Sequence, residues 1–150
     1  MKSLSKALLA AVIIATPAAA HGDEELAPPV VFRHQGMQIV VNSAMGAMSV
    51  LKGEAGSDEN LVPLAEALVA GAKVSQSAFK VDTRTVHGKG EAKDQIWAEW
   101  DKFSAAMDGF VADTEAFLAA AKTGDKSASM AALGKTFKNC KSCHDVYKEK

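Results

Sequence analysis

The sequence predicts an all-α fold, an antiparallel up-and-down four-helix bundle, over residues 21–150. Helix-forming Ala, Leu, Lys and Glu are plentiful, whereas the 150 residues include only four prolines. Apolar residues recur at heptad spacing in four separate segments, and glycines or capping residues lie between those segments. Four amphipathic helices bury such stripes by packing around one shared core. A single domain is therefore expected.

The first twenty residues are expected to be a signal peptide outside this bundle. Lys2 and Lys6 give a positive start, residues 8–15 are apolar, and three alanines ending at Ala20 form a small-residue cleavage site. Cleavage after Ala20 would make His21 the first mature residue. The apolar run is too short to cross a bilayer, so the prediction is an exported, periplasmic protein with no membrane span.

The first two helices are defined by their start signals and inward faces. Pro28 and the following proline start a helix that is expected to end near Lys52. Its predicted inward positions are Val30, His34, Met37, Val41, Ala44, Met48 and Leu51. After a loop, Asp58 is the predicted N-cap of the second helix. The predicted inward face of that helix carries Leu61, Leu64, Leu68, Ala72, Ser75 and Phe79.

A long crossover loop is predicted before the last two helices, because residues 81–91 contain Gly88 and Gly90 and keep no period. The third helix is predicted to end at Gly124, which serves as its C-cap. Its stripe is Ile96, Trp100, Phe103, Met107, Phe110, Thr114, Phe117 and Ala121. Asp125 is expected to cap the fourth helix. The stripe of that helix is Met130, Leu133, Phe137, Cys140, His144 and Tyr147.

The only two cysteines of the chain stand at Cys140 and Cys143, and His144 follows directly. The pattern C-x-x-C-H is typical of c-type haem attachment. Two thiols can add to the two vinyl groups of a porphyrin, and the neighbouring imidazole can become the proximal iron ligand. Positions i, i+3 and i+4 share one face of a helix. The sequence therefore predicts one covalently bound haem c inside the bundle.

Three other interpretations of the cysteine pair were weighed. A redox-active disulfide is expected in a βαβ context, and nothing strand-like precedes Cys140. A zinc site would need a fourth ligand and a wider separation between its ligand pairs. A structural disulfide between residues three apart in a helix has poor geometry. Covalent haem is the favoured prediction.

The chain resembles the class II c-type cytochromes, which are cytochrome c′ and its low-spin relatives of the c-554 and c-556 kind. The resemblance covers nearly all of residues 21–150, and its most specific part is the haem motif at the very end of the chain. Three weaker matches are Phe32-Arg33-x-x-x-Met37, Met45-Gly46 with Lys52-Gly53-Glu54, and Ile96-Trp97.

The resemblance implies roles for individual residues. Cys140 and Cys143 would form the thioethers and His144 would be the proximal iron ligand. Arg33 matches the arginine beside the haem propionates, a role that suits its fixed charge. Lys148 stands where the family usually has an arginine, four residues after the histidine.

Met37 decides the functional prediction, because it matches the distal position of the family. There a methionine can ligate the iron or an apolar residue can block it. Ligation by His144 and Met37 predicts a mono-haem electron carrier that serves redox partner proteins of an electron-transfer chain. The alternative is a five-coordinate cytochrome c′ that binds NO or CO, with Met37 as a distal steric gate. Plain core packing of Met37 stays open as well.

Other function classes have less support. No Ser/His/Asp set, paired carboxylate site or phosphate-binding loop is present, so the chain is predicted not to be an enzyme. An enzyme that uses an open haem to turn over peroxide or NO is the remaining rival. With 17 basic and 18 acidic residues there is no basic footprint for nucleic acid. The resemblance implies a homodimer through the first two helices, because such dimers are common in the family. Ile39 and Val40 are apolar residues outside the heptad of the first helix, so they are candidates for the partner surface.

Overall fold

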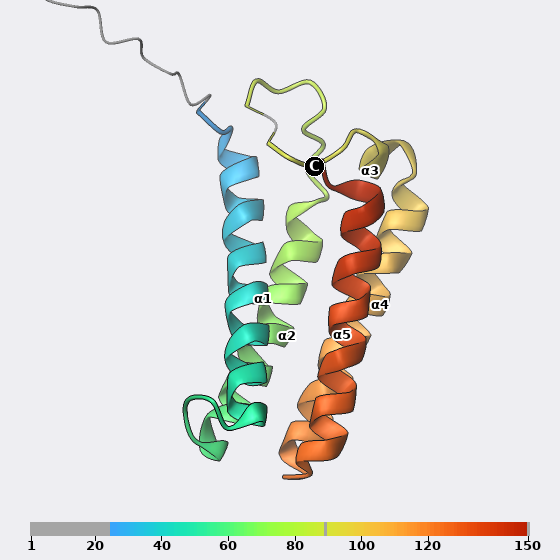
Figure 1. The fold of residues 1–150 in the computed structure, drawn as a ribbon. Helices are drawn as coiled ribbons and strands as arrows, with labels where there is room; N and C mark the ends of the chain where they lie inside the picture. Colours follow the sequence, from blue (N-terminus) through green and yellow to red (C-terminus); the bar gives the residue numbers. More distant parts are fainter. Residues whose placement is uncertain (1–24, 89, 150) are drawn as a thin grey trace, which may run out of the picture.

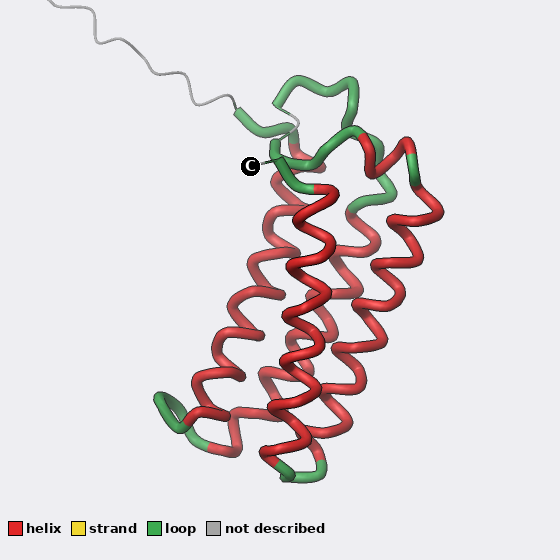
Figure 2. The backbone as a smooth tube through the Cα atoms, turned by 45° about the vertical axis from the view of Figure 1, so that its right-hand side comes forward, coloured by secondary structure: helices red, strands yellow, loops and turns green. Residues whose placement is uncertain are grey.

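The computed structural model describes residues 25–88 and 90–149. Four long helices form an antiparallel bundle in which α1 and α4 run one way and α2 and α5 run the other (Figure 1). Their bounds are α1 Pro28–Lys52, α2 Leu61–Ala78, α4 Trp100–Lys122 and α5 Lys126–Tyr147, with a short 3₁₀-helix η1 at Asp58–Asn60 and a short α3 at Gln95–Ala98. The described chain is drawn in Figure 2 as helix and loop throughout, which confirms the all-α prediction. The signal peptide predicted for residues 1–20 lies outside the described residues.

Both ends of α1 lie where the sequence signals predict them. Proline occupies the first turn, where a backbone N–H has no intrahelical partner to lose. The helix ends at Lys52 because Gly53 adopts a left-handed conformation, with φ 69°. The Gly53 amide then donates to the carbonyl of Val50 at 3.0 Å, which satisfies one of the last carbonyls of the helix.

The start of α2 differs from the prediction. Ser57, not Asp58, is the capping residue, and Asp58 lies inside the 3₁₀ turn η1 that leads into α2. The Asn60 side chain accepts hydrogen bonds from the Ser57 amide at 2.9 Å and from the Ser57 hydroxyl at 3.2 Å. Ser57 therefore caps η1, and Asn60 is the residue that precedes α2, so the prediction of Asp58 as the N-cap of α2 was wrong.

The predicted third helix is broken into α3 and α4. Glu99 separates them with φ −121° and ψ 42°, outside the helical region. Ile96 is buried, and the neighbouring Trp97 is half-buried and donates its indole N–H to the Phe79 carbonyl at 3.0 Å. The non-helical backbone at Glu99 therefore separates α3 from the long helix α4.

The connection from α4 to α5 agrees with the sequence prediction. Gly124 has φ 75°, and its amide donates to the Ala121 carbonyl at 3.2 Å, which ends α4. The Asp125 carboxylate then accepts from the Ala128 amide at 3.0 Å and caps α5. Because this turn is short, α4 and α5 are antiparallel neighbours, and α5 returns to the end of the bundle where α1 starts (Figure 1).

The core is unevenly distributed among the helix pairs. The helix α2 packs on both α1 and α4, and α4 packs on α5, whereas α1 and α5 touch only sparsely. The predicted inward stripe of the third helix is mostly fully buried, as is that of α2 apart from the half-buried Leu64. None of the helices among residues 25–88 and 90–149 is long and apolar enough to cross a membrane.

The face that α1 buries agrees only in part with the predicted one: Val30, Ala44 and Leu51 are buried as predicted, and Met37 and Met48 are half-buried. His34 is exposed and Val41 is 44% exposed, whereas a different strip is buried: Arg33, Gly36, Val40, Ser43, Ala47 and Val50. Small residues let α1 and α2 approach closely, since a Cβ on Gly71 would lie 2.9 Å from Ile39 Cγ2 and 3.1 Å from the Val40 amide nitrogen. Val40 therefore belongs to the core, and the interpretation of it as a partner surface was wrong.

Candidate haem site

The cysteine motif lies in the last third of α5, which confirms that its residues occupy a helix. Cys140 and Cys143 are free thiols, each half-buried and packed against the edge of the hydrophobic core. Burial raises the pKa of both thiols, and for Cys143 the neighbouring Cys140 adds to the rise. His144, the next residue, is exposed.

Arg33 is buried, unlike most arginines: only 5% of it is exposed. Its guanidinium donates to the Thr83 hydroxyl and to the Val81 carbonyl, with each distance 3.3 Å. The Nε atom is buried and has no hydrogen-bond partner. Burial lowers the pKa of Arg33, although a guanidinium remains charged at any physiological pH. A buried cation with one unpaired donor is suited to receiving an anion.

Met37 follows Arg33 by one turn of α1, so the two side chains leave the helix on neighbouring faces. Its side chain is half-buried and packs against the hydrophobic core. His34 is exposed, and its ring nitrogen lies 3.4 Å from the amide nitrogen of Gln38. The predicted inward strip of α1, with His34, Met37 and Val41, is therefore only partly covered by the rest of the protein.

A clasp formed by residues 91–93 and 147–149 holds the end of α5. The Lys93 amide donates to the Tyr147 carbonyl at 3.0 Å, and the Glu149 amide donates to the Glu91 carbonyl at 2.8 Å. Ala92 and Lys148 form an antiparallel bridge between these bonds. The clasp begins only three residues after His144, so it fixes the chain next to the haem motif.

The clasp also includes an ion pair of Lys148, the cation that follows the haem motif. The Lys148 ammonium lies 2.8 Å from a Glu91 carboxylate oxygen. This hydrogen bond holds the pKa of Glu91 below its ordinary 4.5. Sequence reasoning missed this contact, because the crossover has no periodic pattern.

A buried aspartate on α4 holds α5 through Asn139, the residue before Cys140. Asp113 is 8% exposed and lies on α4. Its carboxylate accepts from the Asn139 side-chain amide at 2.5 Å and pairs with the Lys135 ammonium at 2.7 Å. Buried carboxylates are stable only when they are paired in this way, so the contact favours one register of α5. Sequence reasoning did not single out Asp113, which precedes Thr114 of the predicted stripe.

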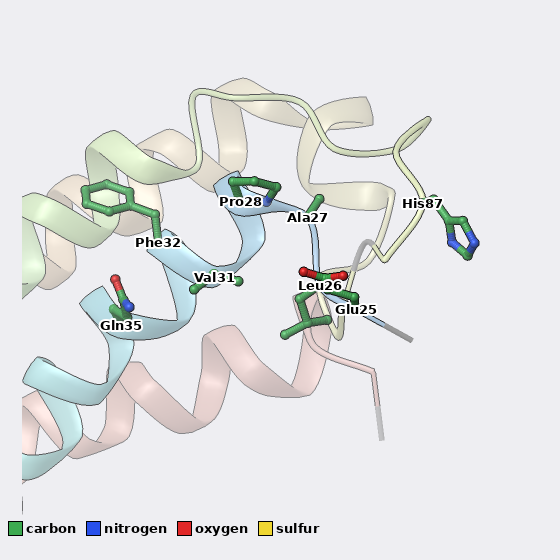
Figure 3. Close-up of a pocket in the computed structure, with 8 residues that line it drawn as sticks. All are labelled: Glu25, Leu26, Ala27, Pro28, Val31, Phe32, Gln35 and His87. Carbon is green, nitrogen blue, oxygen red and sulfur yellow. The ribbon is translucent and has the colours of Figure 1, made fainter. Parts of the chain in front are cut away.

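A cavity of about 970 Å³ lies elsewhere, at the start of α1. It is lined by the segment before α1, by Val31 and Phe32, and by His87 of the crossover loop (Figure 3). None of its lining residues is among the predicted haem ligands. In Figure 3 the His87 ring extends away from the side chains of α1. The depression is therefore separate from the cysteine motif on α5.

Comparison with known proteins agrees with this geometry. The family model described as cytochrome c′ matches residues 29–148. The chain belongs to the cytochrome c′ family. Cytochrome c′ of Rubrivivax gelatinosus is 35% identical over 120 residues, which are 79% of this chain and 92% of that protein. Its crystal structure has a TM-score of 0.74 and 30% identity, and the match covers 81% of this chain and 94% of that one.

A second solved relative carries functional information. It is the nitrosyl complex of a variant of cytochrome c prime from Alcaligenes xylosoxidans, with a TM-score of 0.74 and 26% identity, and the match covers 84% of this chain and all of that one. The class II c-type assignment and the four-helix bundle predicted from sequence are both confirmed. As a member of the cytochrome c′ family, the chain carries one covalently attached haem c.

The residues that the structure presents fit this cofactor. Two half-buried thiols lie one turn apart on α5, the helix that contacts α1 only sparsely. The strip of α1 with Met37 is incompletely covered, and the buried Nε of Arg33 has no partner. A flat apolar group with carboxylate side chains has the chemistry to match these features. The haem interpretation therefore rests on side-chain environments as well as on the C-x-x-C-H motif.

Proposed function

We propose that this cytochrome c′ family member is a periplasmic haem protein that binds a small diatomic gas, NO or CO. Cys140 and Cys143 form the two thioethers, which keep the porphyrin on α5. His144 would hold the iron, and Met37 of α1 would limit the access of a gas to it. The haem would supply the coordination site and the redox couple, and the surrounding residues would determine which small ligands reach the iron.

The packing of Met37 is the observation that carries this proposal. Its side chain lies against the hydrophobic core, where dispersion contacts hold it among apolar neighbours. A methionine held in this way acts as a flexible plug, because it has three rotatable bonds and can yield to a small ligand. The solved nitrosyl complex of the Alcaligenes relative supports NO as one such ligand.

Electron transfer is the second candidate function. Met37 is only half-buried and follows Arg33 by one turn, so its sulfur is a candidate for the sixth iron ligand. Histidine and methionine ligation raises the reduction potential and suits an electron carrier that serves redox partner proteins. In that case the iron would have no position left for a gas.

An optical titration separates the two candidates. The purified ferrous holoprotein should show high-spin bands that shift when CO is added. Replacing the plug by Met37→Ala should speed CO binding about tenfold, which corresponds to lowering the barrier by about 1.4 kcal/mol. Met45→Ala is the matched control, because Met45 is on the same helix and is 53% exposed. Its binding rate should equal that of the unmodified protein.

The opposite result would identify an electron carrier. Low-spin bands, a weak long-wavelength sulfur-to-iron band and no response to CO would mean that Met37 ligates the iron. Met37→Ala should then convert the spectrum to high spin and create CO binding. Either pattern is readable from the same samples.

A homodimer through α1 and α2 is part of the same proposal. Phe32 and Ile39 lie seven residues apart, on one face of α1, and they are 50% and 44% exposed. We expect light scattering to give twice the mass of one chain, and Phe32→Glu to shift the protein toward the monomer by burying a charge at the contact. Val146→Glu, at a 41% exposed position on α5, should leave the mass unchanged. A monomeric unmodified protein would contradict the dimer.

A further inference from the structure

The environment of the Arg33 guanidinium is unusual for a buried cation. Every acceptor that the described residues offer it is uncharged: the Thr83 hydroxyl receives both terminal nitrogens, and the Val81 carbonyl receives one. The third kind of donor, Nε–H, is buried and unpaired. Buried charges are normally paired with an opposite charge, and this guanidinium lacks an anionic partner among the described residues.

Two aromatic rings restrict the plane of the guanidinium. Its central carbon lies 4.5 Å from the centre of the Phe79 ring and 5.1 Å from the Trp97 ring. Those distances are within the range of cation–π attraction. The Trp97 indole donates to the backbone carbonyl of Phe79 at 3.0 Å, so the Trp97 ring is anchored at the residue that follows α2. Arg33 from α1 is thus held by the end of α2 and by α3.

Thr83 fixes the remaining degree of freedom, which is rotation within that plane. Its side chain is fully buried, and its hydroxyl oxygen lies 3.3 Å from each terminal nitrogen of Arg33. The five N–H groups of a guanidinium have a rigid planar arrangement. When both terminal nitrogens are anchored on one oxygen, the direction of the Nε–H on the other side is set as well.

The carboxylate next to Thr83 in the sequence does not pair with the Arg33 guanidinium. Asp82 precedes Thr83, but its oxygens bond to the Arg84 side chain at 2.7 to 3.2 Å. This contact leaves Asp82 and Arg84 as an exposed pair on the outside of the crossover. The crossover therefore gives Arg33 a neutral hydroxyl and keeps its own carboxylate away from it.

We infer that Thr83 is a positioning residue for Arg33, and that it directs the free Nε–H of Arg33 at a carboxylate of the covalently bound haem. The inference rests on the haem site proposed above and adds the crossover loop to it. Thr83 does not touch the haem in this role. It acts by orienting the arginine, whose positive charge is paired only when the haem carboxylate is present.

The test is the reduction potential of the purified holoprotein measured as a function of pH. A cation beside a haem carboxylate favours the ionised carboxylate and the ferrous iron. Thr83→Val keeps the shape of the side chain but removes the hydroxyl. We expect it to lower the potential and to raise the pH at which the potential responds to protonation, toward the values of Arg33→Met. Thr83→Ser keeps the hydroxyl and should retain the profile of the unmodified protein.

A double variant makes the assignment specific. If Thr83 acts through Arg33, Thr83→Val should change nothing further when Arg33 is already methionine. Arg84→Met, in the same loop but exposed and paired with Asp82, is the control and should leave the profile unchanged. A wild-type profile in Thr83→Val, a shifted profile in Thr83→Ser, or additive effects in the double variant would overturn the inference.

These outcomes do not depend on which function the iron performs. The CO titration reports on the distal side of the haem and on Met37, whereas the pH profile reports on the carboxylate and Arg33. If CO fails to bind, the profile still tests Thr83. If Thr83→Val does not accumulate in folded form, Thr83→Ala makes the same comparison because it also lacks the hydroxyl. It should lower the potential, and an unchanged profile would overturn the inference.

Discussion

Replacing both Cys140 and Cys143 by serine should abolish covalent haem attachment completely. These are the only cysteines in the chain, so no other thiol can form a thioether. The haem of the unmodified protein should survive acid–acetone extraction and remain with the polypeptide in a denaturing gel. In the double variant the extract should contain all of the haem, and the mass of the polypeptide should equal that of the bare chain.

The single variants and a control make this result more informative. Cys140→Ser and Cys143→Ser should each keep haem through the remaining thioether, with an altered optical spectrum. Ser142→Ala is the matched control, because Ser142 lies between the cysteines but is exposed and bonds only to the Asn139 carbonyl. Its haem content should be unchanged. Haem that resists extraction from the double variant would refute the proposed attachment.

Phe103→Ala should cost about 3 to 5 kcal/mol of unfolding free energy, the largest stability loss expected from one substitution in this core. Phe103 is 1% exposed on α4. Its ring centre lies 4.9 Å from that of Phe79, 5.2 Å from Tyr147 and 5.9 Å from Trp100. Truncation removes these contacts and leaves a cavity that the helices cannot close.

The same substitution should loosen the haem end of the bundle. Phe79 lies under the Arg33 guanidinium, and Tyr147 follows His144 by three residues. Urea unfolding of the holoprotein measures the loss, and Phe103→Leu should lose less because it refills much of the volume. Phe32→Ala, at a 50% exposed position, should change stability by less than about 0.5 kcal/mol when measured on the monomer. A loss below about 1 kcal/mol for Phe103→Ala would contradict the central place given to this ring.

Most of the fold could be predicted because its signals are local. A helix end depends on residues within one turn, so the prolines at the start of α1, Gly53 after it and Asp125 before α5 indicated the boundaries correctly. The stripes of α2 and α4 follow from a period of about 3.6 residues. The same local reasoning failed at Asp58, where a 3₁₀ turn capped by Ser57 precedes α2, and at Glu99, where the predicted third helix is broken.

The prediction for α1 failed in part for a different reason. A heptad pattern chose the strip with His34 and Val41, but α1 buries Gly36 and Val40 instead. Close approach to α2 at Gly71 decides this rotation. A pattern of hydrophobicity cannot distinguish a strip that packs on a neighbouring helix from one that is left for a cofactor, because both are apolar.

The sequence by itself determined that this chain forms four long helices, and it predicted haem attachment at the C-x-x-C-H motif. Those features depend on residues at most four positions apart, whose spacing is visible in one dimension. Only the tertiary structure showed that Arg33 is buried against Thr83, 50 residues away, and that Glu91 holds Lys148 beside the haem motif. Such contacts arise when packing brings distant segments together, and the sequence alone carries no periodic record of them.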